Sequence, residues 1–331
     1  MKKLIDQNYA AGDESAAFLQ DHDRTLYQVK NSTGEMVIRE HKVFPGIWLV
    51  YKDAHIGTFA YPTAYPSGLL EITHCCEGRF EYDAGEQFFY LGKGDLAIHA
   101  SWEEQAAVNC PTRHYHGISV VIDPAAAPRC FSCILNDVEV EPSKLLAKFC
   151  PENRYYIMRS TPRLEHIFSE LYSVPEHIQK GYFKVKVLEL LLFLSALEPD
   201  DSQTEQRACS RSQVELAKRV CAFLDENMAK RFTIDQLAAQ FYVSPAQLKK
   251  CFYSVYDESV YTYIRSHKIK SAAALLRTSD QTVAEIAGAV GYDNSSKFAK
   301  AFRDIMGVSP GEYRRHAPRS EVEAVAVWSE K

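Results

Sequence analysis

The sequence of 331 residues lacks any long run of apolar side chains. A helix that crosses a membrane needs about 20 consecutive, mostly apolar residues, and the N-terminal stretch MKKLIDQNYA lacks the apolar segment of a secretory signal peptide. Cysteine occurs nine times, and an odd number in a long chain does not fit the disulfide framework of a small secreted protein. We therefore expect a cytoplasmic protein with mostly reduced thiols and no membrane partner.

A strong excess of positive charge is also lacking, since the formal net charge is -5. Residues 212–318 carry 15 Lys and Arg against 11 Asp and Glu, which leaves this segment at +4 and the rest of the chain at -9. An excess of this size is modest for a protein that binds nucleic acid. The positions of the basic side chains are therefore more informative than their number.

The length of the chain suits two domains. The segment 198–211, EPDDSQTEQRACSR, is polar, contains Pro and Ser, and has no apolar periodicity. It predicts a linker between a domain at residues 1–197 and a second domain at residues 212–318, with a short tail at residues 319–331.

Near the C-terminus, the stretch IAGAVGYDNSSKFAKAFRDIMGVSPGEYRR carries the signals of three successive helices. Just before it, Thr282 and Glu285 form a capping box that opens the first helix. Gly291 ends that helix, and Ser309 with Pro310 opens the third. On the middle helix three apolar residues recur at helical spacing and are predicted to face the core. They are Phe298, Phe302 and Ile305.

A second copy of this arrangement lies upstream, in the segment FTIDQLAAQFYVSPAQLKKCF. Thr233 with Gln236 forms a capping box, and Ser244 with Pro245 and Gln247 forms another. The apolar residues of a helix predicted at residues 259–277 are placed to pack against both copies and to fix their separation.

The spacing in the C-terminal copy closely resembles the signature of the AraC/XylS family of bacterial transcriptional regulators. The matching residues are Ile286, Ala287, Val290, Gly291, Tyr292, Phe298, Phe302, Gly307, Ser309, Pro310 and Tyr313. The resemblance covers residues 213–317 and implies an all-α domain with two helix-turn-helix units. Two such units on one connecting helix are expected to enter successive major grooves of double-stranded DNA, about 34 Å apart. The sequence departs from the family at Asp257, where the family has Gly, and at Lys268, where Arg is usual.

The resemblance also assigns DNA-facing positions to the outward side chains of the two recognition helices. These residues are Ala246, Lys249 and Lys250 in the first unit and Ser295, Ser296, Lys297 and Lys300 in the second. Lysine and serine can bond base edges, which gives sequence preference, or contact phosphates, which gives affinity that falls with salt. On the connecting helix, Arg265 and Lys268 are candidates for phosphate contact, with simple solvation as the alternative.

Upstream of the linker, residues 44–123 consist of short β-branched and aromatic runs that are interrupted by Gly, Pro and Asp. This pattern predicts an antiparallel sandwich or a small barrel. The turn sequences EGRF at residues 77–80 and GKGDL at residues 92–96 resemble those of a cupin barrel, the sensor domain commonly joined to AraC-type DNA-binding domains. The expected fold class is α+β: a cupin-like β-barrel followed by helices, and then the all-α domain.

Two apolar helices are expected after the barrel. One carries Leu164, Ile167, Phe168 and Leu171, and the other carries Phe183, Val187, Leu190, Leu191 and Leu194. The second helix is apolar on more than one face, which favours packing on the barrel and on the second subunit of a homodimer.

Three histidines are predicted to point into the barrel. His114 and His116 share one strand face with Ile118 and Val120, and His74 shares its strand face with Ile72. Three inward imidazoles could hold a metal, but the sequence lacks the paired histidines and downstream carboxylate of the usual metal-cupin motif. We therefore expect no metal, no cofactor and no enzymatic activity.

An organic effector is the preferred ligand of the barrel, because a small barrel can enclose one small molecule. The expected effector contacts are His74, Arg79, Tyr82, Trp102, His114 and His116. Cys130 and Cys133 form a CxxC pair, but no second pair and no thioredoxin-like pattern accompanies it.

The sequence thus predicts a DNA-binding transcriptional regulator that is controlled by a small molecule. By the habit of the family it is expected to be an activator that contacts RNA polymerase. The alternative is a metal-dependent cupin enzyme, or a metal sensor, with an attached DNA-binding domain.

Overall fold

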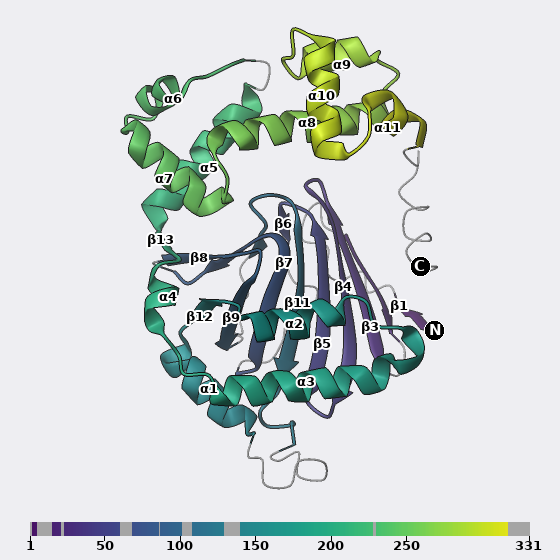
Figure 1. Cartoon of the computed structure of the whole chain (residues 1–331), viewed down its shortest axis with the longest axis vertical. Coiled ribbons are helices and arrows are strands. Elements are labelled where there is room, and N and C mark those ends of the chain that lie inside the picture. Colours follow the sequence, from purple (N-terminus) through teal and green to yellow (C-terminus); the bar gives the residue numbers. More distant parts are fainter. Residues whose placement is uncertain are drawn as a thin grey trace. The chain divides into compact units, whose positions relative to one another are not determined.

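The computed structural model describes residues 2–4, 15–20, 23–59, 68–85, 87–100, 108–128, 140–227 and 230–316. The chain divides into two compact units, Met1–Ser210 and Arg211–Lys331 (Figure 1). Trp102, the Cys130/Cys133 pair and the predicted tail at residues 319–331 lie outside the described residues.

The N-terminal unit is built on a curled antiparallel sheet (Figure 1). Its strands are β1 Lys2–Leu4, β2 Ser15–Gln20, β3 Arg24–Asn31, β4 Gly34–Phe44, β5 Ile47–His55, β6 Thr58–Phe59, β7 Leu70–Asp83, β8 Gln87–Gly92, β9 Asp95–Ala100, β10 Val108–Asn109, β11 Tyr115–Ile122, β12 Tyr156–Arg159 and β13 Ala208–Ser210. The main path runs β1-β2-β3-β4-β5-β11-β7-β10-β6. Strands β8 and β9 also pair with β7, and they carry β13 and β12 respectively.

Strand β7 is the longest and takes part in two parts of the sheet. Its first half pairs with β9 and β11, and its second half, from Arg79, pairs with β8. Gly78 lies between the halves with φ +82°, and a Cβ there would collide with the carbonyl of His114. Glycine is needed because no side chain fits at this bend. The bend allows the two parts of the sheet to face each other.

Helices cover one face of the sheet. They are α1 Pro142–Phe149, α2 Pro162–Leu171 and α3 Gln179–Ala196, with short 3-10 turns η2 Pro151–Asn153 and η3 Glu176–Ile178 (Figure 1). The apolar residues predicted for the two later helices are all buried in one cluster with alternate strand residues such as Leu49, Ile72 and Val120. Alternation along the strands therefore sends every second side chain to these helices.

The other face of the sheet forms a second apolar cluster. Its members come from β3–β9, β11 and β12 and include Met36, Val50, Phe80, Phe89, Tyr115 and Val121. This cluster lies between the two parts of the curled sheet, so it is the interior toward which effector contacts were predicted to point. The sheet is a half-barrel, and the helices follow it in the chain as predicted.

The segment for which the sequence favoured a linker contains two elements of secondary structure. Helix α4 spans Asp201–Glu205, and β13 pairs with β8 in the N-terminal unit. The polar residues of this segment form a short helix. Asp200 caps the helix by accepting a hydrogen bond from the Ser202 amide.

All secondary structure in the described residues of the C-terminal unit is helical. Its helices are α5 Arg211–Glu226, α6 Ile234–Gln240, α7 Pro245–Tyr256, α8 Val260–Thr278, α9 Val283–Ala289, α10 Ser295–Met306 and α11 Pro310–His316. The capping boxes predicted at Thr233 and Thr282 are confirmed, with both reciprocal hydrogen bonds present in each. The predicted connecting helix is α8, which packs Ile269, Ala272 and Leu276 against α9 and α10.

Candidate nucleic-acid interface and sensor-domain sites

The first helix pair of the C-terminal unit is α6 and α7, joined by a tight turn. Tyr242 in this turn has φ +57° and is 95% exposed. Ser244 begins α7 by accepting a hydrogen bond from the Gln247 amide at 3.2 Å. Helix α7 buries Leu248, Cys251 and Phe252 and leaves Ala246, Lys249 and Lys250 exposed. The outward face is therefore the one that the sequence assigned to DNA.

The second pair, α9 and α10, repeats this geometry. Gly291 occupies the turn with φ +77°, at the place that Tyr242 takes in the first pair. Asn294 caps α10 by accepting hydrogen bonds from the amides of Ser296 at 2.9 Å and Lys297 at 3.0 Å. Helix α10 buries Phe298, Ala301 and Phe302 and leaves Ser295, Ser296, Lys297 and Lys300 exposed.

The four lysines on α7 and α10 have no carboxylate partner among the residues that the structure describes. An exposed ammonium group without an internal partner is available to an external anion. The capped N-terminus of each helix adds a favourable field for negative charge. Both helices thus offer the groups that a phosphate backbone requires.

The two candidates on α8 differ from this pattern. Arg265 forms an ion pair with Asp304 of α10 at 2.5 Å and is partly exposed. Lys268 is only 7% exposed. Its pKa is lowered mainly by burial and further by the nearby positive charge of Arg231. A phosphate contact by Lys268 is not supported, because its side chain lies against the domain and helps to line a small hollow beside Leu224.

An exposed ion pair connects the segments that precede α6 and α10. Arg231 donates to Asp293 at 2.7 Å, and both side chains are largely exposed. Pairs of this kind contribute little stability, typically about 0–1 kcal/mol. The packing of α8 against both helix pairs is therefore the main determinant of their separation.

In the N-terminal unit, the predicted effector residues do not come together. His74 on β7 is 2% exposed, stacks on Phe168 at a centroid distance of 4.6 Å, and bonds Glu165 through Nε2 at 2.8 Å. Burial lowers the pKa of His74, although Glu165 opposes this shift. The expectation that His74 points into the barrel is wrong, because its strand face is the one that α2 covers.

His114 and His116 also lie away from the interior. They flank Tyr115, which is fully buried in the interior cluster, so their side chains leave the sheet on the opposite side. There they lie beside His55 of β5, with ring centroids 5.1 Å and 5.2 Å from that ring. The sequence placed these two histidines on one strand face, which is confirmed, but the face was assigned to the wrong side of the sheet.

Tyr82 is the predicted effector residue that does lie in the interior. Its ring lies 5.0 Å from that of His99 and 5.1 Å from that of Tyr155. Arg79 is placed differently, with its guanidinium 5.3 Å from the ring centre of Tyr90. Five of the six predicted contacts are described, and they fall into separate places rather than one pocket.

The interior contains a buried charged group that sequence reasoning missed. Lys52 of β5 donates to Glu71 of β7 at 2.6 Å, and Thr73 donates to the same carboxylate at 3.0 Å. Thr73 also bonds Ser119 at 2.8 Å, and His99 Nε2 lies 3.7 Å from Glu71. Burial alone would raise the pKa of Glu71, but the charges of Lys52 and His99 and hydrogen bonds from Lys52 and Ser119 lower it to about 2. The sequence signal was present as polar residues alternating with apolar ones on adjacent strands.

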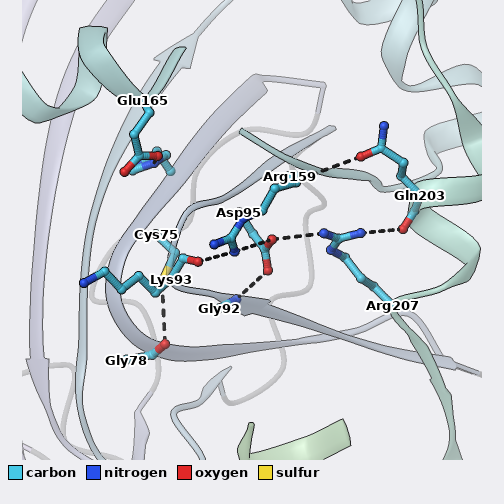
Figure 2. A network of polar contacts seen from close by, with 10 residues as sticks. Cys75, Gly78, Gly92, Lys93, Asp95, Arg159, Glu165, Gln203 and Arg207 are labelled. Carbon is cyan, nitrogen blue, oxygen red and sulfur yellow. Dashed lines mark hydrogen bonds and ion pairs between the residues drawn. The ribbon is translucent and has the colours of Figure 1, made fainter. Parts of the chain in front are cut away.

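A second network ties the end of the N-terminal unit to the sheet. Figure 2 shows the guanidinium groups of Arg159 and Arg207 directed at the Asp95 carboxylate, with Nη···Oδ1 distances of 3.5 Å and 3.1 Å. Asp95 also accepts a hydrogen bond from the Gly92 amide at 3.0 Å. Because Arg207 directly precedes β13, this network and the β8–β13 pairing hold the last residues of the unit on the sheet.

Comparison with known proteins identifies the C-terminal unit. A sequence family described as "Helix-turn-helix domain" matches residues 237–316. The MmsAB operon regulatory protein of Pseudomonas aeruginosa is 32% identical over 100 residues, covering 30% of this chain and 33% of that protein. The HTH-type transcriptional regulator AlkR of Acinetobacter baylyi is 32% identical over 88 residues, covering 27% of this chain and 29% of that protein. This chain therefore spans about a third of the length of these relatives.

A solved structure, the C-terminal domain of AraT, a response regulator from Geobacillus stearothermophilus, is 30% identical. The match covers 32% of this chain and 88% of that chain with a TM-score of 0.31. The domain match and these relatives confirm that the C-terminal domain resembles the DNA-binding domain of AraC-type regulators. In the part of the chain that the structure describes, no helix has the length and apolar character needed to span a membrane.

Proposed function

We propose that the protein is a sequence-specific DNA-binding transcriptional regulator of the cytoplasm, most simply an activator that contacts RNA polymerase. The observation that carries the proposal is the helix-turn-helix domain at residues 237–316, with two helices that present capped N-termini and exposed basic side chains. Relatives that share this domain are named as regulators.

Both helix pairs are proposed to read DNA. In each pair the second helix has a buried apolar side and an outward polar side, which is what insertion into a major groove requires. Ala246 offers only a methyl contact, whereas Ser295 and Ser296 can exchange hydrogen bonds with bases. The second unit is therefore expected to carry more sequence preference, and the first unit to contribute mainly phosphate contacts through Lys249 and Lys250.

The N-terminal unit is proposed to bind a small organic effector in its half-barrel. Binding sites of this kind combine an apolar lining with a few convergent polar groups. Tyr82, His99 and Tyr155 supply aromatic surface, and the Lys52–Glu71 pair supplies buried polar atoms nearby. These residues replace His74, His114 and His116 as the proposed contacts. Homodimerisation through α3 is also proposed, supported by its exposed Val185, which is 60% exposed.

Selection of bound duplexes from a random DNA pool tests the proposed function. The full chain is expected to enrich a defined sequence, and Ser296→Ala is expected to relax the preference at one or two positions, since a lost base contact costs about 1–3 kcal/mol of discrimination. Ser169→Ala, an exposed serine of α2, serves as the matched control. Failure to enrich any sequence would contradict sequence-specific binding.

A further inference from the structure

Three histidines from two neighbouring strands form a cluster on the outer side of the sheet. His116 belongs to β11 and His114 directly precedes that strand, while His55 belongs to β5, which pairs with β11 in antiparallel register. One ring nitrogen from each histidine can be chosen so that all three lie within 4.8 Å of one another. Imidazole is the side chain most often used to bind zinc and related divalent metals.

A carboxylate lies at the same point. Asp53 is the register partner of His116, and its Oδ1 atom lies 3.3 Å from His116 Nδ1 and 3.3 Å from His55 Nε2. This oxygen is buried and accepts no hydrogen bond among the described residues, despite the two nearby ring nitrogens. A shared cation would satisfy a buried carboxylate oxygen that lies this close to two ring nitrogens.

The ligand atoms of the three histidines lie within 4.8 Å of one another and Asp53 lies outside that group, so a tetrahedral site requires these side chains to close in around the ion. Zinc binds nitrogen and oxygen at about 2.0 Å, so the ligand atoms of a tetrahedral site lie about 3.3 Å apart. The two Asp53 distances match this edge, and the Nδ1 atoms of His55 and His114 are 3.4 Å apart. His55 faces Asp53 and His114 through different ring nitrogens, so its ring has to turn modestly to present one nitrogen to the ion. Its side chain is 60% exposed.

An outer carboxylate supports one of the ligands. Glu77 Oε1 lies 3.3 Å from His114 Nε2, on the side of the ring opposite to the nitrogen that faces His55. Metal-binding histidines commonly donate their second nitrogen to a carboxylate, which fixes the ring and its tautomer. Glu77 reaches this position because Gly78 bends β7 directly after it.

We propose that His55, His114, His116 and Asp53 bind one divalent metal ion of the zinc class, with Glu77 as a positioning residue for His114. The site is separate from the half-barrel interior, where Tyr82 and the Lys52–Glu71 pair lie. Bound metal joins the ends of β5 and β11 and therefore stabilises the folded N-terminal unit. The proposal does not depend on effector binding or on DNA binding.

Zinc titration of the full chain tests this site. Protein stripped with a chelator is titrated with Zn²⁺ in a calorimeter, and Co²⁺ is used in parallel because tetrahedral Co²⁺ absorbs strongly in the visible range. The unsubstituted chain is expected to bind one ion and to give the Co²⁺ spectrum of a site with nitrogen and oxygen ligands. His116→Ala is expected to weaken binding at least 100-fold, and Glu77→Gln by about 10–100-fold.

Two controls make the assignment specific. His177→Ala removes an exposed histidine of η3 outside the cluster and is expected to leave binding unchanged. The double variant Cys130→Ser/Cys133→Ser, which removes the CxxC pair, is also expected to bind zinc normally. If His116→Ala fails to fold by circular dichroism, His55→Ala replaces it, because the His55 side chain is 60% exposed.

Either of two results would overturn the proposal. One is the absence of stoichiometric binding to the unsubstituted chain. The other is binding that is unchanged in His116→Ala or His55→Ala. If binding were then lost in the cysteine variant, the ion would be assigned to the cysteines.

Discussion

The salt dependence of DNA binding gives the sharpest quantitative prediction for the proposed interface. Lys249 on α7 and Lys300 on α10 are exposed, and they have no carboxylate partner in the described part of the chain. Each phosphate that a lysine neutralises on duplex DNA contributes about -0.9 to the slope of log K against log[salt]. Replacing both lysines by glutamine is therefore expected to reduce the magnitude of the slope by about 1.8.

The same relation fixes the loss of affinity. At about 0.15 M salt, two lost phosphate contacts correspond to roughly 30-fold weaker binding, if the affinity extrapolated to 1 M salt is unchanged. Fluorescence anisotropy of a labelled duplex, measured with the full chain at several salt concentrations, gives both quantities. The control replaces two exposed lysines of the N-terminal unit, Lys42 and Lys144, by glutamine. An unchanged slope in the Lys249/Lys300 variant would refute the assignment of α7 and α10 as the DNA-contacting helices.

Two further predictions concern stability. Burial is the main cause, and the positive charges of Arg24 and Arg39 add to it, in lowering the pKa of His41 from 6.5 to about 4. Because the unfolded chain then binds the proton more readily than the folded one, stability falls as the pH drops below 6.5, by about 2 kcal/mol between pH 7 and pH 5. Between pH 7 and pH 5, the free energy of unfolding of a His41→Leu variant is expected to fall by about 2 kcal/mol less than that of the unsubstituted chain. Chemical unfolding followed by tryptophan fluorescence measures both values, and an equal fall in the two proteins would contradict this account. Asp257 ends α7 with φ +58°, where Gly307 ends α10 with φ +76°. Asp257→Gly is expected to stabilise the C-terminal unit by roughly 0.5 kcal/mol, since relief of the left-handed strain exceeds the added chain entropy. A lower midpoint of unfolding would show that Asp257 contributes contacts that outweigh its strain.

Local signals in the sequence predicted the C-terminal unit well. The capping boxes at Thr233 and Thr282 and the glycine turn at Gly291 each depend on residues within four positions of one another, so the sequence contains the whole interaction. The outward and inward faces of α7 and α10 followed from helical periodicity for the same reason.

The misplaced residues are those whose surroundings depend on distant parts of the chain. Lys268 was a candidate for phosphate contact, with simple solvation as the alternative, but it is buried and lines a hollow together with residues of α5, more than 40 residues away in the sequence. His74 was predicted to face the barrel interior, but alternation along β7 shows only which residues share a face. Helix α2 decides which face is covered, and it begins at Pro162. The cluster of His55, His114 and His116 was missed because it joins strands that are distant in sequence.

A footprint of the full chain on the duplex selected from the random pool tests the central claim most directly. Hydroxyl-radical cleavage is expected to show two protected segments on one face of the DNA, about 10 base pairs apart, as two helix pairs that enter successive major grooves require. Protection of a single segment would contradict the proposal that both helix pairs read DNA. Uniform weak protection along the duplex would contradict sequence-specific binding altogether.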